Sequence, residues 1–323
     1  MPHVAGRWHT ATTRAQLGLA RRGIGPGRAF ESSVTWILGS PRSGSTWLLL
    51  TLGSLPGVVP INEPLIGEYL GNIVADYRGI GIEELDVSNF TFERQRRHVE
   101  DQFFSPAYRD VWSPLLGKLI KTRFLAHVAR PPRDTPLSKT TVLVKEPSGS
   151  QAADLLLDAL PRSRALFLLR DGRDVVDSEL AAFAPGGWLS REFDGITPVG
   201  PEDRLEFVVR SASKWLWRTQ VVQEAIKGHP GPTLTVKYED LLAEPLRWFG
   251  EIARWLALDA SDEELRRAVD EHDFGRLPAD VRGRDEFFRA AEPGLWRKNL
   301  SADEQQAVEG VIGPKLRQLG YES

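Results

Sequence analysis

The residues best suited to chemistry lie in a short segment near position 40. Ser40-Pro-Arg-Ser-Gly-Ser-Thr-Trp47 places a glycine, several hydroxyls and Arg42 directly before an apolar run. The free backbone N–H groups and the dipole at the start of a helix favour a bound anion. The segment therefore predicts a phosphate cradle, and an ordinary Gly-Ser turn between a strand and a helix is the alternative.

The cation of this loop is placed differently from that of a nucleoside triphosphatase. Those enzymes use Gly-x-x-x-x-Gly-Lys-Ser/Thr, in which the lysine reaches the terminal phosphates and the hydroxyl holds Mg²⁺. That pattern is absent here, and Arg42 precedes Gly44 instead. An arginine suits a bidentate grip on one phosphate, or on the bridge to a leaving group.

A second anion site is predicted within Ala165–Ser178. An apolar strand ends at Arg170, and Ser178 follows eight residues later on a predicted helix. Three further charged residues follow Arg170, and we interpret them as helix caps and surface ion pairs, because an acidic side chain in a first turn stabilises a helix without any substrate. They are Arg173, Asp174 and Asp177.

Both segments resemble the donor-binding motifs of sulfotransferases that use 3'-phosphoadenosine-5'-phosphosulfate (PAPS) and release adenosine 3',5'-bisphosphate (PAP). Arg170 and Ser178 match the family's Arg-(x)7-Ser signature for the 3'-phosphate. The first segment is similar to the 5'-phosphosulfate loop in its Pro-Arg-Ser-Gly form, typical of many bacterial members. The resemblance implies that the 5' end is bound by Arg42, Ser43, Gly44, Ser45, Thr46 and Trp47.

Two later stretches extend the resemblance over roughly residues 34–321. Tyr238 and Trp47 match aromatic residues that lie by the adenine in the family, with packing in the protein core as the alternative for each. Arg289, seven residues before Trp296, matches an arginine that closes on the 3'-phosphate. The Lys-Gly pair that follows it in the family is Ala290-Ala291 here, a departure that affects part of this grip.

The resemblance leaves the general base open. Arg42 is expected to stabilise the transferring group, and Lys145 matches a lysine that assists it. The histidine base of cytosolic members is missing, because this place reads Val144-Lys-Glu-Pro147. Glu146 is one candidate base, or else a structural carboxylate paired with lysine. Glu63, which follows the loop's helix, is the preferred base.

A sheet must position these groups. Short β-branched or apolar runs predict strands, and the long helical stretches between them favour parallel pairing. The fold class expected is α/β, with a P-loop-like central parallel sheet flanked by helices. The predicted strands are Val34–Leu38, Thr141–Val144, Ala165–Leu169 and Thr233–Val236, and the loop's helix is Ser45–Leu52.

Residues 65–140 interrupt the sheet and predict a helical and loop insertion that forms the acceptor wall. A second lid is predicted over residues 183–201, which are rich in Gly and Pro. Aromatic residues of the insertion could line an apolar acceptor pocket, although helical spacing makes core packing the default for most of them. They are Tyr69, Phe103, Phe104, Tyr108, Trp112 and Phe124.

Bulk properties limit the partners. A net charge of −3 and a pI near 6.1 give no electrostatic case for nucleic acid. The chain has no cysteine, no cluster with metal-ligand spacing and no apolar run near the ~20 residues that span a bilayer, so we expect no metal and a cytoplasmic protein. Residues 1–30 hold five arginines and no acid, typical of a flexible basic arm or a transit peptide, and 31–323 are expected to form one domain.

The sequence thus predicts a sulfotransferase that moves a sulfuryl group from PAPS to a hydroxyl of a small-molecule or glycan acceptor, in line and with a carboxylate base. The alternatives are a P-loop nucleotide kinase-like phosphotransferase and a non-catalytic nucleotide-binding module. Lys298–Glu309 does not reproduce the C-terminal segment through which some cytosolic members dimerise, so we expect that this mode is not used.

Overall fold

The computed structural model describes residues 28–74, 104–129, 136–276 and 291–321, with four isolated positions besides. Nearly all of the predicted basic arm lies outside the described residues. Phe103 and Arg289 also lie outside them.

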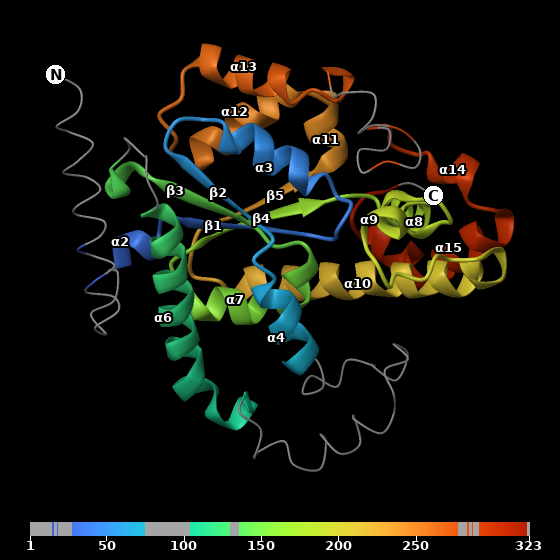
Figure 1. Ribbon diagram of the computed structural model, residues 1–323, viewed down its shortest axis with the longest axis horizontal. Coiled ribbons are helices and arrows are strands. Elements are labelled where there is room, and N and C mark those ends of the chain that lie inside the picture. Colours follow the sequence, from blue (N-terminus) through green and yellow to red (C-terminus); the bar gives the residue numbers. More distant parts are fainter. Residues whose placement is uncertain are drawn as a thin grey trace.

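A five-stranded sheet forms the centre of the molecule (Figure 1). The strand order is β2-β3-β1-β4-β5, and every neighbouring pair is parallel. This confirms the predicted α/β class with a central parallel sheet. The strands are β1 (Val34–Leu38), β2 (Val58–Asn62), β3 (Thr141–Lys145), β4 (Arg164–Leu169) and β5 (Thr233–Lys237).

Strand β2 was not expected from the sequence. Pro60 sits in its middle, opposite Leu143 of β3, and proline cannot donate to a strand ladder. The strand tolerates proline because it lies at the edge of the sheet and pairs on one side only. β2 matters for the site because Glu63 directly follows it.

Helices cover both faces of the sheet, so the central strands are buried on both sides. In β1, Trp36 and Leu38 enter one apolar core and Ile37 enters the other, as the two-residue period of a strand requires. One layer contains α3 (Ser45–Gly53), α11 (Tyr238–Ala243), α12 (Pro245–Trp255) and α13 (Asp262–Glu271). The other contains α6 (Arg109–Val128), α7 (Ala153–Ala159), α8 (Gly172–Phe183), α10 (Arg204–Gly228) and α15 (Ala302–Gln318).

Short elements connect these layers. The α-helical ones are α2 (Arg28–Glu31), α4 (Ile66–Val74), α9 (Trp188–Glu192) and α14 (Trp296–Asn299). The 3₁₀ turns are η4 (Pro106–Tyr108), η5 (Leu137–Lys139), η6 (Ser148–Ala152), η7 (Pro201–Asp203) and η8 (Phe274–Arg276).

The aromatic residues of the expected insertion divide into two groups. Trp112 and Phe124 are buried, and Phe104 packs edge-on against Trp112, so these three serve the core. Tyr69 and Tyr108 are 63% and 55% exposed.

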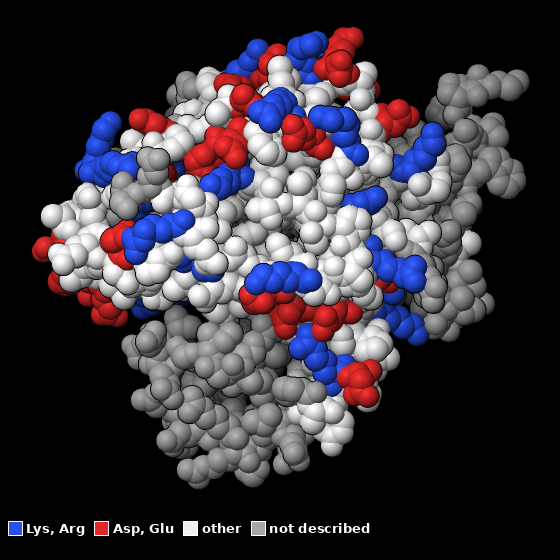
Figure 2. All heavy atoms as spheres, turned by 180° about the vertical axis from the view of Figure 1, so that it is seen from behind, with Lys and Arg blue, Asp and Glu red and all other residues white. Residues whose placement is uncertain are grey.

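The surface shows no separation of charge on the face in Figure 2, where basic and acidic side chains are interspersed. This mixture agrees with the net charge near zero. Among the described residues, no helix has both the length and the apolar character needed to cross a membrane.

Candidate functional site

The candidate residues gather where all five parallel strands end. Gly39 follows β1, Glu63 follows β2, Lys145 ends β3, Arg170 follows β4 and Tyr238 follows β5. Ligands of open α/β sheets bind outside the carboxyl ends of the strands, where the chain crosses to opposite sides of a central strand. β1 is that strand here, since β3 lies on one side of it and β4 on the other.

The loop after β1 requires glycine at position 44 for steric reasons. Gly44 has φ +86°, and a Cβ there would lie 2.5 Å from the ring of Tyr238. Arg42 also has a positive φ, of 66°, which is uncommon for a side-chain-bearing residue. The loop is therefore held close against Tyr238 and turns its backbone into the start of α3.

The structure brings the two predicted anion motifs into direct contact. Nε of Arg42 donates to Oγ of Ser178 at 3.0 Å. Nη1 of Arg170 donates to the backbone oxygen of Arg42 at 2.7 Å, and its guanidinium lies 4.6 Å from the centroid of the Tyr238 ring. Arg42 therefore contacts two residues that lie 128 and 136 positions further along the chain. Together, these groups form one positively charged corner.

Within the part of the chain that the structure describes, several polar atoms in this corner are buried and have no hydrogen-bond partner. They are Oγ of Ser40, Oγ of Ser43, Nε1 of Trp47 and Nε of Arg170. Buried polar groups in native proteins are nearly always hydrogen-bonded, so unpaired ones call for an explanation. A bound anion with several acceptor oxygens fits the donors among them.

The two aromatic residues proposed to lie by a nucleotide base contact each other and the core. Trp47 packs edge-on against Phe249 at 5.2 Å and against Tyr238 at 6.4 Å between ring centroids. Tyr238 is 5% exposed, and burial raises the pKa of its phenol. Both rings therefore form the wall beneath the loop.

Lys145 and Glu63 form an ion pair at the edge of this corner. Nζ of Lys145 lies 2.5 Å from Oε1 of Glu63 and 3.2 Å from Oδ1 of Asn62. The lysine side chain is 5% exposed and the glutamate side chain 36%. The pair thus presents one solvent-accessible carboxylate beside a nearly buried ammonium.

Glu146 occupies a different environment from Glu63. It is 1% exposed, and its two oxygens accept hydrogen bonds from the backbone N–H groups of Leu65 and Gly67, both at 3.1 Å. Burial raises its pKa to about 7. This carboxylate holds the turn between β2 and α4, and that turn carries Glu63.

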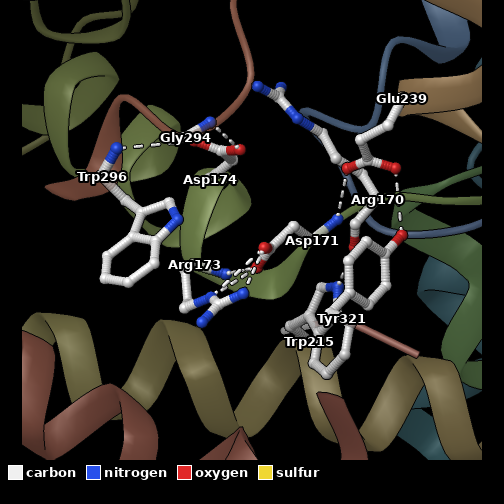
Figure 3. Close-up of polar contacts among 9 residues, drawn as sticks. All are labelled: Arg170, Asp171, Arg173, Asp174, Trp215, Glu239, Gly294, Trp296 and Tyr321. Carbon is white, nitrogen blue, oxygen red and sulfur yellow. Dashed lines mark hydrogen bonds and ion pairs between the residues drawn. The ribbon is translucent and has the colours of Figure 1, made fainter. Parts of the chain in front are cut away.

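A network of carboxylates supports the start of α8 (Figure 3). Asp171 caps the helix, accepting from the backbone of Arg173 at 2.9 Å and also binding its guanidinium. Glu239 accepts from the backbone N–H of Asp171 at 2.9 Å and from the hydroxyl of Tyr321 at 3.1 Å. Burial raises the pKa of the Glu239 carboxyl. These contacts lock the chain directly after Arg170.

Our expectation of surface ion pairs on α8 was wrong. Arg173, Asp174 and Asp177 are 4%, 2% and 3% exposed. Asp174 accepts from the backbone N–H of Gly294 at 2.7 Å, and Asp177 accepts from Nδ2 of Asn299 at 3.1 Å. The C-terminal segment covers this turn of α8, a contact across about 120 residues that helical patterning does not reveal.

The predicted second lid contributes one aromatic residue. Trp188 begins α9, and its ring centroid lies 5.6 Å from the guanidinium carbon of Arg42. Arg42 is thus bordered by Ser178 on one side and by Trp188 on another. Among the described residues, no group of three or more His, Asp or Glu side chains could hold a metal ion.

The solved structures found to be similar to this chain share little of its amino-acid sequence. Sulfotransferase STF9 from Mycobacterium avium is 14% identical, with a TM-score of 0.50 over 89% of this chain and 77% of that one. Mouse sulfotransferase SULT7A1 complexed with PAP is 11% identical, with a TM-score of 0.49 over 88% and 84%. The sulfotransferase domain of the Synechococcus PCC 7002 olefin synthase is 19% identical, with a TM-score of 0.46 over 90% and 95%.

A family model provides the sequence-level match, while no curated protein matches the chain. The model describes the sulfotransferase family and matches residues 35–262, more than half of the chain. The matched range includes the loop after β1, the Lys145–Glu63 pair, Arg170 and Ser178. The chain belongs to the sulfotransferase family.

Proposed function

We propose that this sulfotransferase moves a sulfuryl group from PAPS to a hydroxyl of a small-molecule or glycan acceptor. The observation that carries the proposal is the corner in which Arg42, Ser178 and Arg170 meet beside buried donors that have no partner. The strand ends and the start of α3 offer anion-binding groups at two neighbouring places. A donor with phosphates at both its 5' and 3' positions fits that pair of places.

We assign roles to the donor-binding residues from the motifs that they match in the sulfotransferase family and from where the described residues lie. The 5' end is assigned to the loop after β1, which contributes Arg42, Ser43, Gly44, Ser45 and Thr46. The 3'-phosphate is assigned to Arg170 and Ser178, with Arg289 as a further contact that lies outside the described residues. Trp47 and Tyr238 shape the wall below the nucleotide.

The reaction asks for positioning and charge neutralisation. The acceptor oxygen forms a bond to sulfur as the bond between sulfur and the bridging phosphate oxygen breaks, and the leaving phosphate gains negative charge. Arg42 is permanently cationic and has donors for both groups, so it stabilises that charge. Lys145 adds a second cation near the same strand ends.

Glu63 is the base that we propose for the acceptor proton. Its carboxylate is partly exposed, and its ion pair with Lys145 leaves lone pairs for an acceptor hydroxyl. Glu146 has both oxygens occupied by backbone N–H groups, and we assign it to positioning the turn that carries Glu63.

Calorimetric titration with PAP tests the donor assignment. We expect selective binding of PAP over ADP, and a loss of at least tenfold in affinity in Arg170→Ala. Arg247→Ala is the matched control, because Arg247 is an exposed arginine of α12 whose ion pairs are with the nearby Glu244 and Glu251. Equal affinity for ADP, or the absence of PAP binding, would overturn the proposal.

A further inference from the structure

A second group of charged residues lies between three helices, outside the donor corner. Arg210, Lys214 and Arg218 are spaced four residues apart on α10, so they share one face of that helix. All three are partly buried. Two carboxylates act on this face electrostatically, Glu179 from α8 and Glu68 from α4.

Among the residues that the structure describes, the charges in this cluster do not balance. Three cations face two carboxylates there, and one oxygen of Glu179 already accepts a hydrogen bond from Ser211. Nε of Arg218 is buried and has no hydrogen-bond partner within the same described part of the chain. Burial lowers the pKa of Lys214 and of Arg218, and the carboxylates offset that effect only in part.

An unbalanced cluster of this kind is costly for a folded protein. Removing a charge from water costs several kcal/mol unless a partner of opposite sign compensates it, and a structural cluster would normally be closed by its own counter-charges. Here one positive charge and one buried N–H have no compensating group among the described residues. Such a site is suited to an anion supplied from outside the chain.

The cluster borders the proposed transfer site. Glu179 directly follows Ser178, whose hydroxyl accepts from Arg42. Glu68 lies in the first turn of α4, directly after the turn that Glu146 holds and that carries Glu63. The 3₁₀ turn η6, which follows Glu146, contacts both α4 and α10, and α10 packs against α8 (Figure 1).

We propose that Arg210, Lys214 and Arg218 form an anion subsite for the acceptor, so that the preferred acceptor carries an oxyanion group in addition to the hydroxyl that is sulfated. A carboxylate, a phosphate ester or an existing sulfate ester has this chemistry, since each offers several acceptor oxygens to arginine and lysine. This inference rests on the proposed function, because the acceptor role assumes that the donor corner holds PAPS.

Inorganic sulfate is the probe, titrated by calorimetry into protein already saturated with PAP. PAP fills the phosphate positions of the donor corner, and comparing two lysine variants on α10 separates sulfate at the cluster from sulfate at the vacant sulfuryl position. We expect wild type to bind sulfate and Lys214→Gln to bind it at least tenfold more weakly. Lys227→Gln on the same helix is the matched control and should bind as wild type does, because Lys227 is exposed and forms its ion pair with the similarly exposed Glu224.

A second variant should strengthen sulfate binding, because it removes a carboxylate and keeps all three cations. Glu68→Gln removes one of the two carboxylates, so sulfate should bind severalfold more tightly than to wild type. A purely structural cluster gives a different result, in which Lys214→Gln and Glu68→Gln change thermal stability and leave sulfate affinity unchanged. That result would overturn the anion subsite.

The two proposals fail in distinguishable ways. If PAP does not bind, the donor assignment is wrong, and the sulfate titration is then made without PAP by comparing Lys214→Gln with Lys227→Gln. A tenfold difference between these two variants still supports an anion site at the cluster, and equal affinities overturn it.

Discussion

The corner proposed to hold the donor and the side proposed to face the acceptor are built in contrasting ways. The donor corner is made from strand ends and buried groups, with Ser43 1% exposed and Lys145 4% exposed. The proposed acceptor side is more open: the Glu63 side chain, in the turn after β2, is 36% exposed, and Tyr69 of α4 is 63% exposed. Under the proposed function, the buried corner would fix the donor, whereas the exposed side would allow the acceptor to differ.

The largest effect should come from the donor corner. Arg42→Ala should lower the rate of PAP release from PAPS by about 10³-fold, or about 4 kcal/mol in barrier height, because the charge on the leaving phosphate loses its main stabiliser. The rate is measured with water as the acceptor and with a panel of alcohols. Arg247→Ala should keep the wild-type rate. A rate for Arg42→Ala within threefold of wild type would remove this arginine from the chemistry.

Glu146 joins the two regions, and its effect should depend on pH. Its folded pKa of about 7 lies above the ordinary value of 4.5, so its protonated form is favoured in the folded state. The stability that it contributes is fully present below pH ~4.5 and is lost as the pH rises through 7, a fall of about 3 kcal/mol in the free energy of unfolding.

Urea unfolding at a series of pH values measures this fall. Glu146→Gln stays neutral throughout, so its profile should lack the fall. Glu263→Gln, at an exposed glutamate of α13, should show the wild-type profile. Identical profiles in wild type and Glu146→Gln would contradict the assignment of a buried, readily protonated carboxyl.

Substitution of the proposed base should lower the rate of transfer and leave donor binding unchanged. Glu63→Gln should lower kcat by about 10²-fold, since a general base contributes at least this much, while PAP binding is not weakened. Steady-state kinetics and PAP calorimetry together separate the two effects. Equal losses in kcat and in PAP affinity would place Glu63 in donor binding instead.

The smallest effect concerns the loop itself. Gly44→Ala should reduce the free energy of unfolding by about 2 kcal/mol, from left-handed strain and from the overlap with Tyr238. Gly186→Ala is the control: its φ is +82° but a Cβ there meets nothing within 4 Å, so strain alone should cost about 1 kcal/mol. If the two variants unfold alike, the loop does not press on Tyr238.

Much of the fold was predictable because its signals are local. Strand β1 has the predicted bounds, and β3, β4 and β5 agree to within a residue at each end. Strand β2 was missed because Pro60, a residue that disfavours strands, lies in its middle. Its strand character comes from its pairing along one edge of β3. The prediction that Asp174 lies at the surface was wrong, because the backbone groups that donate to it lie about 120 residues further along the chain.

The sequence by itself determined the elements that we propose bind anions, because a glycine, an arginine and a strand end act through their own backbone and nearest neighbours. It also offered Glu63 and Glu146 as rival bases, with Glu63 preferred. Only the tertiary structure set their environments, since the partners of Glu146 are backbone groups about 80 residues earlier in the chain. The same folding brought Arg210, Lys214 and Arg218 to face carboxylates from two other helices, and no spacing along the chain records that contact.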